Sequence, residues 1–317
     1  MPSEKLVKSG IIAPHKGEGN SKSAIQLDLI ALQEAPVVER KLSGPPPKLA
    51  SIGPKCDTHL HFYDDRYKPL PGTPSPAAAS VADYRQVMTW LGIERAVVVQ
   101  PNAYGDDNSC TMDAVKQLGP VARAVVVVKP GVTDDEMDRL TRAGARGIRF
   151  MSLLGGTLSW DNMDEMARRA HQHGWHALVQ LAGRALPERE GQIRRLPGRF
   201  VIDHIGKFLE PVEPDHPAFK TLLCLLDTGR CWLKLAAPYE WSKTGAPAYA
   251  DVGKLAKILI RHAPDRMIWA SNWPHAQANL FGYPDDGALL DLLLEWAPDD
   301  AVRRKILVSN PAELYGF

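Results

Sequence analysis

From about residue 50 onward, short apolar and β-branched runs alternate along the chain with amphipathic segments of helical length. Nearly continuous apolar runs are typical of strands buried on both faces, and such strands form parallel sheets covered by helices. The runs predict eight strands, at Lys55–His61, Ala96–Gln100, Ala122–Val128, Gly147–Phe150, His176–Leu181, Phe200–Ile205, Cys231–Leu235 and Met267–Ala270. The segments between them predict helices, among them Val81–Leu91, Asp134–Ala143, Trp160–His173, Ala218–Asp227 and Ala250–His262.

The number and spacing of these units favour one architecture. Eight strands that alternate with helices in a chain of 317 residues are typical of a (β/α)8 barrel of the TIM type. The sequence lacks the G-x-G-x-x-G loop that would favour an open, doubly wound sheet. We therefore expect residues 51–317 to form one α/β barrel, preceded by an N-terminal extension of residues 1–50.

The N-terminal extension differs in composition from the rest of the chain. His15–Ser23 is polar and rich in glycine, lysine and serine, which favours a disordered arm. Ser23–Leu42 carries enough apolar positions to pack on the barrel as a short helix or strand, and Gly44–Pro47 indicates a stiff linker. No candidate chemistry falls in this extension. An arm between subunits, a lid over the barrel and an appended tag are all open interpretations.

Composition and charge narrow the class of partner. A formal net charge of +1 gives no basis for binding nucleic acid or an anionic membrane. No apolar run approaches the roughly 20 residues that span a bilayer, and the first residues lack the apolar stretch of a secretory signal. The cysteines (Cys56, Cys110, Cys224 and Cys231) have no metal-knuckle spacing, and all but Cys110 lie in apolar segments. We expect a reduced, cytoplasmic protein.

Two imidazoles stand close together in the sequence Cys56-Asp57-Thr58-His59-Leu60-His61. Because the side chains of a strand alternate between its faces, His59 and His61 are predicted to converge at the end of the first strand. Such a pair can bind a divalent metal or grip a substrate oxygen. A surface strand can also carry this pair with neither role, so the other strand ends decide between these interpretations.

Barrel enzymes place their chemistry at the carboxyl ends of the strands, and polar residues stand at most of these ends. His204 lies at the end of the sixth strand and is expected to face the histidine pair. Arg149 lies inside an apolar strand and is expected to point inward, where a guanidinium can bind a carboxylate. His176 begins its strand, at the opposite end, and is expected to be structural. The other candidates are Asn102, Gln180, Lys207, Tyr239, Asn272 and His275.

Three of these motifs together resemble a known family. Asp57–His61, Asp203–Lys207 and Asn272–His275 are similar to the motifs of the amidohydrolase superfamily. Over about residues 50–317, the chain looks most like the branch of 2-pyrone-4,6-dicarboxylate lactonase, sulfomuconolactone hydrolase and galactarolactone isomerase. The resemblance is strengthened by Val99–Asn102, Tyr249–Val252, Tyr283–Asp286 and Asn310–Tyr315, of which the middle two, with Tyr239-Glu240, look closest to galactarolactone isomerase.

The resemblance implies hydrolysis or rearrangement of a cyclic ester that bears carboxylates, with His59, His61 and His204 around the reacting carbonyl. In the family a strand-eight aspartate activates water, but this chain has Asn272, whose amide cannot accept a proton at neutral pH. The chain also lacks a strand-four lysine that could bridge two metals, which disfavours a two-metal site. Ala237–Glu240 lacks the arginine typical of the lactonases, which disfavours a flat pyrone dicarboxylate as substrate.

Two mechanisms are consistent with the asparagine. In the first, His59, His61 and His204 hold one Zn²⁺, and its water, with a pKa lowered toward ~7, attacks the lactone carbonyl while Asn272 orients water or substrate. In the second, no metal binds, the histidines act as general acid and base, and a substrate hydroxyl attacks, so that the lactone shifts ring size. We favour hydrolysis, the commoner activity among the relatives. Lactone isomerisation is the alternative, and a catalytically inactive binding protein is a remote one.

The substrate-binding residues are the same in either mechanism. Arg149 and Lys207 are expected to hold a substrate carboxylate. Hydroxyl groups or the ester are expected to bind to Asn102, Gln180 and Tyr239, with His275 as a further binding residue. The expected ligand is a small anionic lactone, such as a muconolactone or a sugar-diacid lactone. A homodimer is one open alternative for the assembly.

Overall fold

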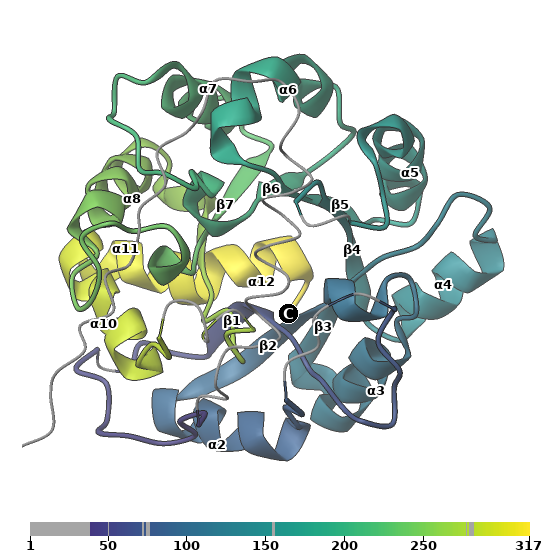
Figure 1. The fold of residues 1–317 in the computed structure, drawn as a ribbon, viewed down its shortest axis with the longest axis horizontal. Helices are drawn as coiled ribbons and strands as arrows, with labels where there is room; N and C mark the ends of the chain where they lie inside the picture. Colours follow the sequence, from purple (N-terminus) through teal and green to yellow (C-terminus); the bar gives the residue numbers. More distant parts are fainter. Residues whose placement is uncertain are drawn as a thin grey trace, which may run out of the picture.

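The computed structural model describes residues 39–49, 51–71, 73, 77–153, 156–276, 278 and 282–317. Its centre is a sheet of eight parallel strands in sequence order: β1 Lys55–Leu60, β2 Ile93–Val99, β3 Ala122–Val126, β4 Ala145–Met151, β5 His176–Gln180, β6 Phe200–Ile202, β7 Cys231–Leu235 and β8 Met267–Trp269. The segment after β8 returns to β1, since Asn272 N–H donates to the His59 carbonyl (2.9 Å) and His61 N–H to the Trp273 carbonyl (2.8 Å). The chain therefore forms the predicted (β/α)8 barrel (Figure 1).

Helices lie between successive strands and cover the outside of the barrel (Figure 1). The first of them, α2, begins after Ser80, which forms a capping box with Asp83, and it ends at Gly92, where φ is 65°. All five predicted helices are present. The helices are α2 Val81–Leu91, α3 Ser109–Leu118, α4 Asp134–Arg142, α5 Trp160–Gln172, α6 Leu186–Arg194, α7 Pro217–Leu226, α8 Ala250–His262, α10 Asp286–Trp296, α11 Asp300–Arg304 and α12 Asn310–Tyr315.

All eight predicted strands are present, but two differ from the prediction in a way that matters. β2 begins at Ile93, earlier than predicted, because Gly92 ends α2 directly before it. β6 ends at Ile202, because the chain then enters a short 3-10 segment, His204–Gly206. The prediction that His204 lies on the sixth strand is therefore wrong, and this histidine stands on the turn that follows it.

The inside of the barrel is filled by a column of side chains that we call the inner cluster. Its members alternate along the strands with residues that pack against the helices, as is usual for barrels of this size. The strands contribute Cys56, Val97, Val99, Val125, Leu178, Val201, Trp232 and Ile268 to the inner cluster. The column is a packed core, so any chemistry is confined to its ends.

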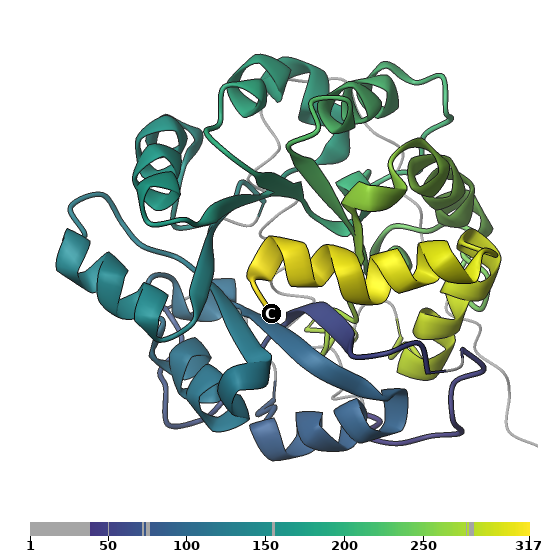
Figure 2. The ribbon, with the colours of Figure 1, turned by 180° about the vertical axis from the view of Figure 1, so that it is seen from behind.

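The C-terminal helices cover the amino end of the barrel. In Figure 2, α11, α12 and the π-helical Lys305–Ser309 between them cross this end as one rod. Tyr315 packs into the inner cluster from below. The ring of His176, at the start of β5, meets Tyr315 edge-on with 5.2 Å between the ring centroids. His176 therefore lies at the end opposite the histidine pair.

Of the N-terminal extension, the structure describes Glu39–Leu49, so the expected arm and most of the expected helix or strand lie outside the described residues. The guanidinium of Arg40 donates to the Ala78 carbonyl (2.8 Å), and the indole of Trp90 donates to the Pro45 carbonyl (2.8 Å). The predicted linker is thus packed against α2.

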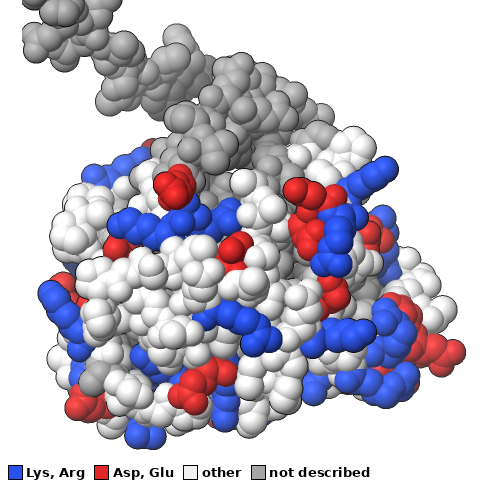
Figure 3. All heavy atoms as spheres, turned by 90° about the horizontal axis from the view of Figure 1, so that it is seen from below, with Lys and Arg blue, Asp and Glu red and all other residues white. Residues whose placement is uncertain are grey.

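Acidic and basic side chains are interspersed on the face drawn in Figure 3, in keeping with the formal net charge of +1. Within the part of the chain that the structure describes, no helix has the length and apolar character needed to cross a membrane. The four cysteines are free, and three are buried. Cys224 is the exception to its predicted apolar setting, because it falls on the exposed side of α7.

Candidate active site

At the carboxyl end of the barrel, the inward-facing positions change from apolar to polar. Alternate residues of a strand share a face, so the second residue after a member of the inner cluster also points inward. On three neighbouring strands this second residue is polar and buried: Leu178 is followed by Gln180, Val201 by Asp203, and Trp232 by Lys234. These side chains form a polar layer on top of the inner cluster, where a barrel enzyme holds its substrate.

His59 and His61 meet at the end of β1 as predicted, but through an irregular strand. Because Cys56 belongs to the inner cluster, strict alternation would turn His59 away from it. The register of β1 against β2 shifts within this stretch, and the Nε2 atoms of the two imidazoles lie 3.1 Å apart. His61 Nδ1 lies 2.7 Å from the Val99 carbonyl oxygen. Since that oxygen can only accept, we assign the His61 hydrogen to Nδ1.

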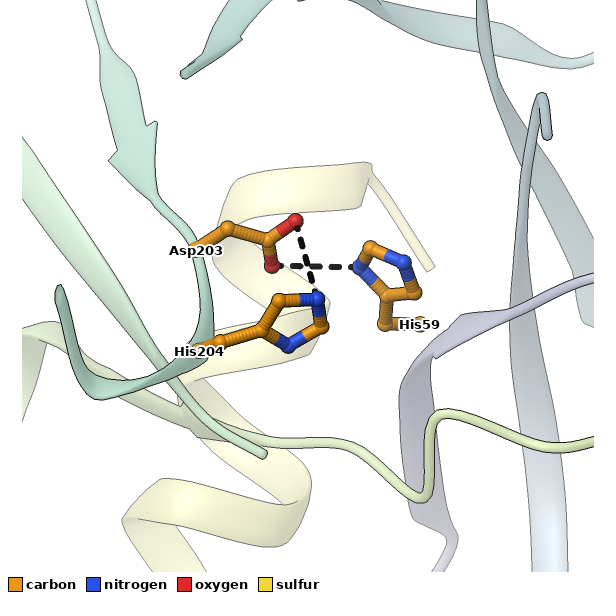
Figure 4. Close-up of side chains that lie close together, drawn as sticks. All are labelled: His59, Asp203 and His204. Carbon is orange, nitrogen blue, oxygen red and sulfur yellow. Dashed lines mark ion pairs between the residues drawn. The ribbon is translucent and has the colours of Figure 1, made fainter. Parts of the chain in front are cut away.

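Asp203 and His204 follow β6, and the Asp203 carboxylate faces the rings of both His204 and His59 (Figure 4). Asp203 Oδ1 is 3.2 Å from His59 Nδ1, and Oδ2 is 3.5 Å from His204 Nε2. Burial lowers the pKa of His59 well below its ordinary value and that of His204 to about 4. Both rings are therefore neutral near pH 7.

Asp203 is ionised, although it is buried beside neutral histidines. Although burial alone would raise it, the neighbouring His204, His59 and Lys234 hold the pKa of Asp203 well below its ordinary value. Burial also lowers the pKa of His61 to about 3. Asp203 is thus an anion beside neutral imidazoles.

The polar layer contains a lysine that the sequence motifs do not reveal, Lys234 on β7. Its side chain is fully buried, and its Nζ lies 3.0 Å from His59 Nδ1. Burial lowers the pKa of Lys234 to about 8, against the opposing effect of Asp203. Alternation along Cys231–Leu235 is the signal that could have placed this side chain inside. A buried lysine is costly, which indicates a role.

A chain of hydrogen bonds extends from Asn272, after β8, to the start of α10. The amide nitrogen of Asn272 donates to the Tyr239 hydroxyl (2.8 Å) and to Glu240 Oε1 (3.1 Å). The Tyr239 hydroxyl donates to His275 Nδ1 (2.8 Å), and His275 Nε2 donates to Asp286 Oδ1 (2.9 Å). The direction follows because an amide nitrogen only donates and a carboxylate only accepts. The sequence identified Asp286 only as part of the motif Tyr283–Asp286.

Lys207 forms an ion pair with Glu240. Its Nζ lies 2.6 Å from Glu240 Oε2, with side-chain exposures of 9% and 7%. Although burial opposes the change, Lys207 lowers the pKa of Glu240, so this carboxyl is ionised. The sequence identified Glu240 only as part of a motif. A substrate carboxylate that binds Lys207 has to share the ammonium with this glutamate.

Arg149 points into the barrel as predicted and meets another predicted residue there. Its guanidinium donates to the Gln100 carbonyl (2.6 Å) and to Gln180 Oε1 (2.8 Å). Arg149 Nε and the amide nitrogen of Asn102 are buried and have no hydrogen-bond partner among the described residues. These two donors are therefore unused by the protein and suit an oxygen-bearing ligand.

Several candidate residues hold a left-handed backbone conformation. The angle φ is 49° at His204, 43° at Lys207, 64° at Asn272 and 59° at His275. Residues with a Cβ adopt such angles at a cost, and only where the surrounding structure enforces them. The turns after β6 and β8 are thus strained at the residues that carry the polar side chains, which is typical of functional sites.

His59, Asp203 and His204 form a group that could hold a metal ion, with one ligand atom from each within 4.8 Å of the others. Imidazole and carboxylate are ligands that zinc accepts. Neither oxygen of Asp203 makes a hydrogen bond among the described residues, which leaves both open to a cation. The group differs from the predicted ligands, because Asp203 stands between His59 and His204 while His61 contacts the other nitrogen of His59.

The same motifs and fold occur in known proteins. The amidohydrolase family profile matches residues 56–317. The chain belongs to the amidohydrolase family. Relatives of this amidohydrolase include a D-galactarolactone isomerase of Agrobacterium fabrum, 39% identical over 280 residues, which are 87% of this chain and 96% of that protein. A 4-sulfomuconolactone hydrolase of Hydrogenophaga intermedia is 35% identical over 82% of this chain and 88% of its own length.

A solved structure agrees with these matches. An apo protein from Agrobacterium tumefaciens, 38% identical, superposes with a TM-score of 0.82 over 88% of this amidohydrolase and 99% of that chain. The predicted resemblance to the family and the predicted barrel are both confirmed. The roles of the individual site residues stay predictions.

Proposed function

We propose that this amidohydrolase is a lactone isomerase, which moves the ester of a small, carboxylate-bearing lactone from one hydroxyl of the molecule to another. Its relatives support a cyclic ester as the substrate class, since one is a D-galactarolactone isomerase and another a 4-sulfomuconolactone hydrolase. Isomerisation and hydrolysis start with attack on the same carbonyl carbon. They differ only in the nucleophile, which is a substrate hydroxyl in one case and water in the other.

The environment of Asn272 is the observation that carries the choice of isomerisation. Its amide nitrogen donates to both Tyr239 and Glu240, so the residue is held as a hydrogen-bond donor. It cannot take a proton from water, as an aspartate at this position could. A hydroxyl of the substrate is already held beside its own carbonyl and needs less activation than water.

His204 is placed to act as the general base for that hydroxyl. Its Nδ1 is buried without a hydrogen-bond partner among the described residues, while its Nε2 faces Asp203. With the hydrogen on Nε2, Nδ1 accepts the proton of the attacking hydroxyl. The carbonyl carbon gains a bond to that oxygen and loses its bond to the former ring oxygen, which receives the proton. No atom enters or leaves the molecule.

Two unused donors suit the anionic parts of such a substrate. Arg149 is a cation that can hold a carboxylate or the charge that develops on the carbonyl oxygen. Asn102 can donate to a hydroxyl or to the ester, and its amide nitrogen lacks a partner among the described residues. Tyr239, fixed between Asn272 and His275, is positioned to orient a ring hydroxyl. The proposed ligand is thus a small anionic lactone.

Hydrolysis is the second candidate, and the group of His59, Asp203 and His204 favours it. A zinc ion held by these residues would polarise the carbonyl and lower the pKa of a bound water. The sequence alone favoured hydrolysis over isomerisation. We now favour isomerisation, because the amide nitrogen of Asn272 donates to Tyr239 and Glu240. An inactive binding protein has the least support, because an unpaired base and unpaired donors gather at the carboxyl end of the barrel, where barrel enzymes hold their substrates.

An isotope experiment separates the three functions. The purified protein is incubated in H₂¹⁸O with galactarate-type and muconolactone-type lactones, and products are followed by NMR and mass spectrometry. We expect a ring-shifted lactone of unchanged mass. An open-chain acid that carries ¹⁸O as the first product would contradict isomerisation. The absence of turnover for every carboxylate-bearing lactone, in folded protein that binds them, would favour the binding protein.

A further inference from the structure

A chain of three hydrogen bonds links β2, β1 and β7 across the carboxyl end of the barrel. It runs from the Val99 carbonyl to His61 Nδ1 (2.7 Å), from His61 Nε2 to His59 Nε2 (3.1 Å), and from His59 Nδ1 to Lys234 Nζ (3.0 Å). The carbonyl at one end can only accept, and the ammonium at the other end can only donate. Every hydrogen between these ends therefore has one consistent position.

The chain fixes the tautomers of both imidazoles. His61 carries its hydrogen on Nδ1 and offers the Nε2 lone pair to His59. His59 then carries its hydrogen on Nε2 and offers the Nδ1 lone pair to Lys234. A nitrogen binds a metal ion only through a free lone pair. In this arrangement neither imidazole has a lone pair that is not already accepting a hydrogen bond.

The alternative tautomer of His59 would be ready for a metal ion. With its hydrogen on Nδ1, His59 would donate to Asp203 Oδ1, which lies 3.2 Å away. Its Nε2 lone pair would then converge with that of His61, at a separation of 3.1 Å that suits two ligands of one zinc ion. This tautomer sets an N–H group against the hydrogens of Lys234, so the lysine and the metal-ready form exclude each other.

The contacts favour the tautomer of His59 with its hydrogen on Nε2, since His59 Nδ1 lies 3.0 Å from Lys234 Nζ and 3.2 Å from Asp203 Oδ1. Lys234 makes a hydrogen bond to His59, whereas neither oxygen of Asp203 makes one among the described residues. The Lys234 side chain is fully buried and follows Trp232 of the inner cluster on the same face of β7. A divalent ion beside the ammonium would in addition meet a like charge in a buried site.

We propose that Lys234 is a positioning residue that keeps divalent metal out of this site, by holding His59 in the tautomer that cannot bind it. The sequence left a metal site of three histidines as one of two alternatives, and in this proposal Lys234 is the residue that decides between them. This inference concerns metal binding alone and holds whichever lactone reaction the protein catalyses.

The direct test is a gain of metal binding in Lys234→Met, which keeps the length of the side chain and removes its donor. Purified proteins are incubated with Zn²⁺, passed through gel filtration and analysed by inductively coupled plasma mass spectrometry. We expect the parent protein to retain no more zinc than His59→Ala, and Lys234→Met to retain about one ion per chain. Co²⁺ should give ligand-field absorption bands only in Lys234→Met.

Two controls test whether the gain of zinc binding depends on Lys234 and on the histidine pair. Lys257→Met removes a lysine on the surface of the barrel that pairs with Glu295, and it should leave zinc binding at the parent level. The double variant Lys234→Met/His61→Ala should lose the gained ion. Parent protein that retains about one zinc through His59, or folded Lys234→Met that gains none, would overturn the proposal.

Loss of folding in Lys234→Met would not leave the proposal open, because the tautomers can be read in the parent protein. Long-range ¹H–¹⁵N correlation spectra of protein labelled with ¹⁵N-histidine distinguish the two protonated nitrogens. We expect one imidazole with the hydrogen on Nε2 whose signals vanish in His59→Gln, and one with the hydrogen on Nδ1 that vanishes in His61→Gln. A His59 signal with the hydrogen on Nδ1 would refute the proposal.

Discussion

The two ends of the barrel bury histidine in opposite ways. At the carboxyl end, both nitrogens of His59 have partners, His61 on one side and Lys234 on the other. At the amino end, neither nitrogen of His176 has a hydrogen-bond partner among the described residues, and its ring packs on Tyr315. Burial lowers the pKa of both rings. Burial and a shifted pKa therefore do not by themselves mark a functional histidine.

A single strand passes from one environment to the other. On β5, His176 lies at the amino end, Leu178 belongs to the inner cluster, and Gln180 accepts a hydrogen bond from Arg149 in the polar layer. The three residues share one face of the strand. Position along the barrel axis, rather than residue type or strand, thus separates the structural residue from the functional candidate, as expected for a fold whose active sites lie at one end.

The same substitution at the two ends should have the largest and most unequal effects. His204→Gln removes the proposed base and should lower kcat by ~10²–10⁴, the usual contribution of a general base. His176→Gln lies at the opposite end and should leave kcat and KM unchanged. Steady-state kinetics on the substrate found in the isotope experiment, with circular dichroism as a check of folding, makes the comparison. Equal losses of activity would show that the difference between the ends is not functional.

Asn272→Asp removes the hydrogen bonds that Asn272 donates to Tyr239 and Glu240, and it keeps the shape of the side chain. The new carboxylate cannot donate to Tyr239, and it faces Glu240 Oε1, which now lies 3.1 Å from the Asn272 amide nitrogen. Repulsion between the carboxylates and the loss of a donor should lower the rate of the ring shift by ~10–10³.

The product of Asn272→Asp sharpens the assignment further. We expect little ¹⁸O-labelled acid, since the side chain at this position faces Tyr239 and Glu240, which hold it away from an attacking water. Strong hydrolysis that arises where the parent protein shows no activity would instead indicate a hydrolase disabled by the asparagine. Asn272→Ala serves as the matched control, because it removes the donor without adding charge.

Arg149→Met tests whether the unused donor at the carboxyl end binds the substrate anion. The loss of a charge-assisted hydrogen bond costs about 1.5–3 kcal/mol, so KM for a carboxylate-bearing lactone should rise by ~10–10². The neutral ester of the same lactone should bind the two proteins equally. An unchanged KM for the anionic lactone would remove Arg149 from the carboxylate site. Lys129→Met, which alters an exposed ion pair with Asp106, is a suitable control.

The sequence was a good guide to the barrel and a partial guide to the site. Apolar runs predicted every strand, because burial on both faces leaves a pattern that any later packing preserves. The motifs predicted that His59 and His61 converge, and their Nε2 atoms do meet. The reason was different from the predicted one, since the irregular register of β1, and not regular alternation, turns His59 inward.

The residues that the sequence did not reveal are those whose role depends on pairing across the barrel. Lys234 looks like one polar residue in an apolar strand, and nothing local to β7 indicates that it meets His59 from β1. Asp286 lies on α10 and reaches His275 only because the turn after β8 brings them together. Contacts between distant segments depend on the closure of the barrel and on left-handed turns, and neither leaves a periodic pattern.

The smallest expected effect concerns His176 at the amino end, whose burial should make the stability of the protein depend on pH. The pKa of His176 is about 3 in the folded protein and 6.5 as an unperturbed group. Between these values the unfolded chain binds a proton that the folded protein excludes, so the free energy of unfolding falls as the pH falls from 6.5. At about 1.4 kcal/mol per pH unit, His176 should account for a loss of roughly 2 kcal/mol by pH 5.

His176→Leu isolates this contribution, because the buried histidines at the carboxyl end stay in place. Urea unfolding at pH 7 and pH 5 should show that the variant loses about 2 kcal/mol less stability than the parent over this range. His171→Leu, at an exposed position of α5, should follow the parent. Parallel pH dependence of His176→Leu and parent would mean that His176 is not held neutral. The environment of His176 at the amino end would then differ less from that of the paired histidines at the carboxyl end than its lack of hydrogen-bond partners indicates.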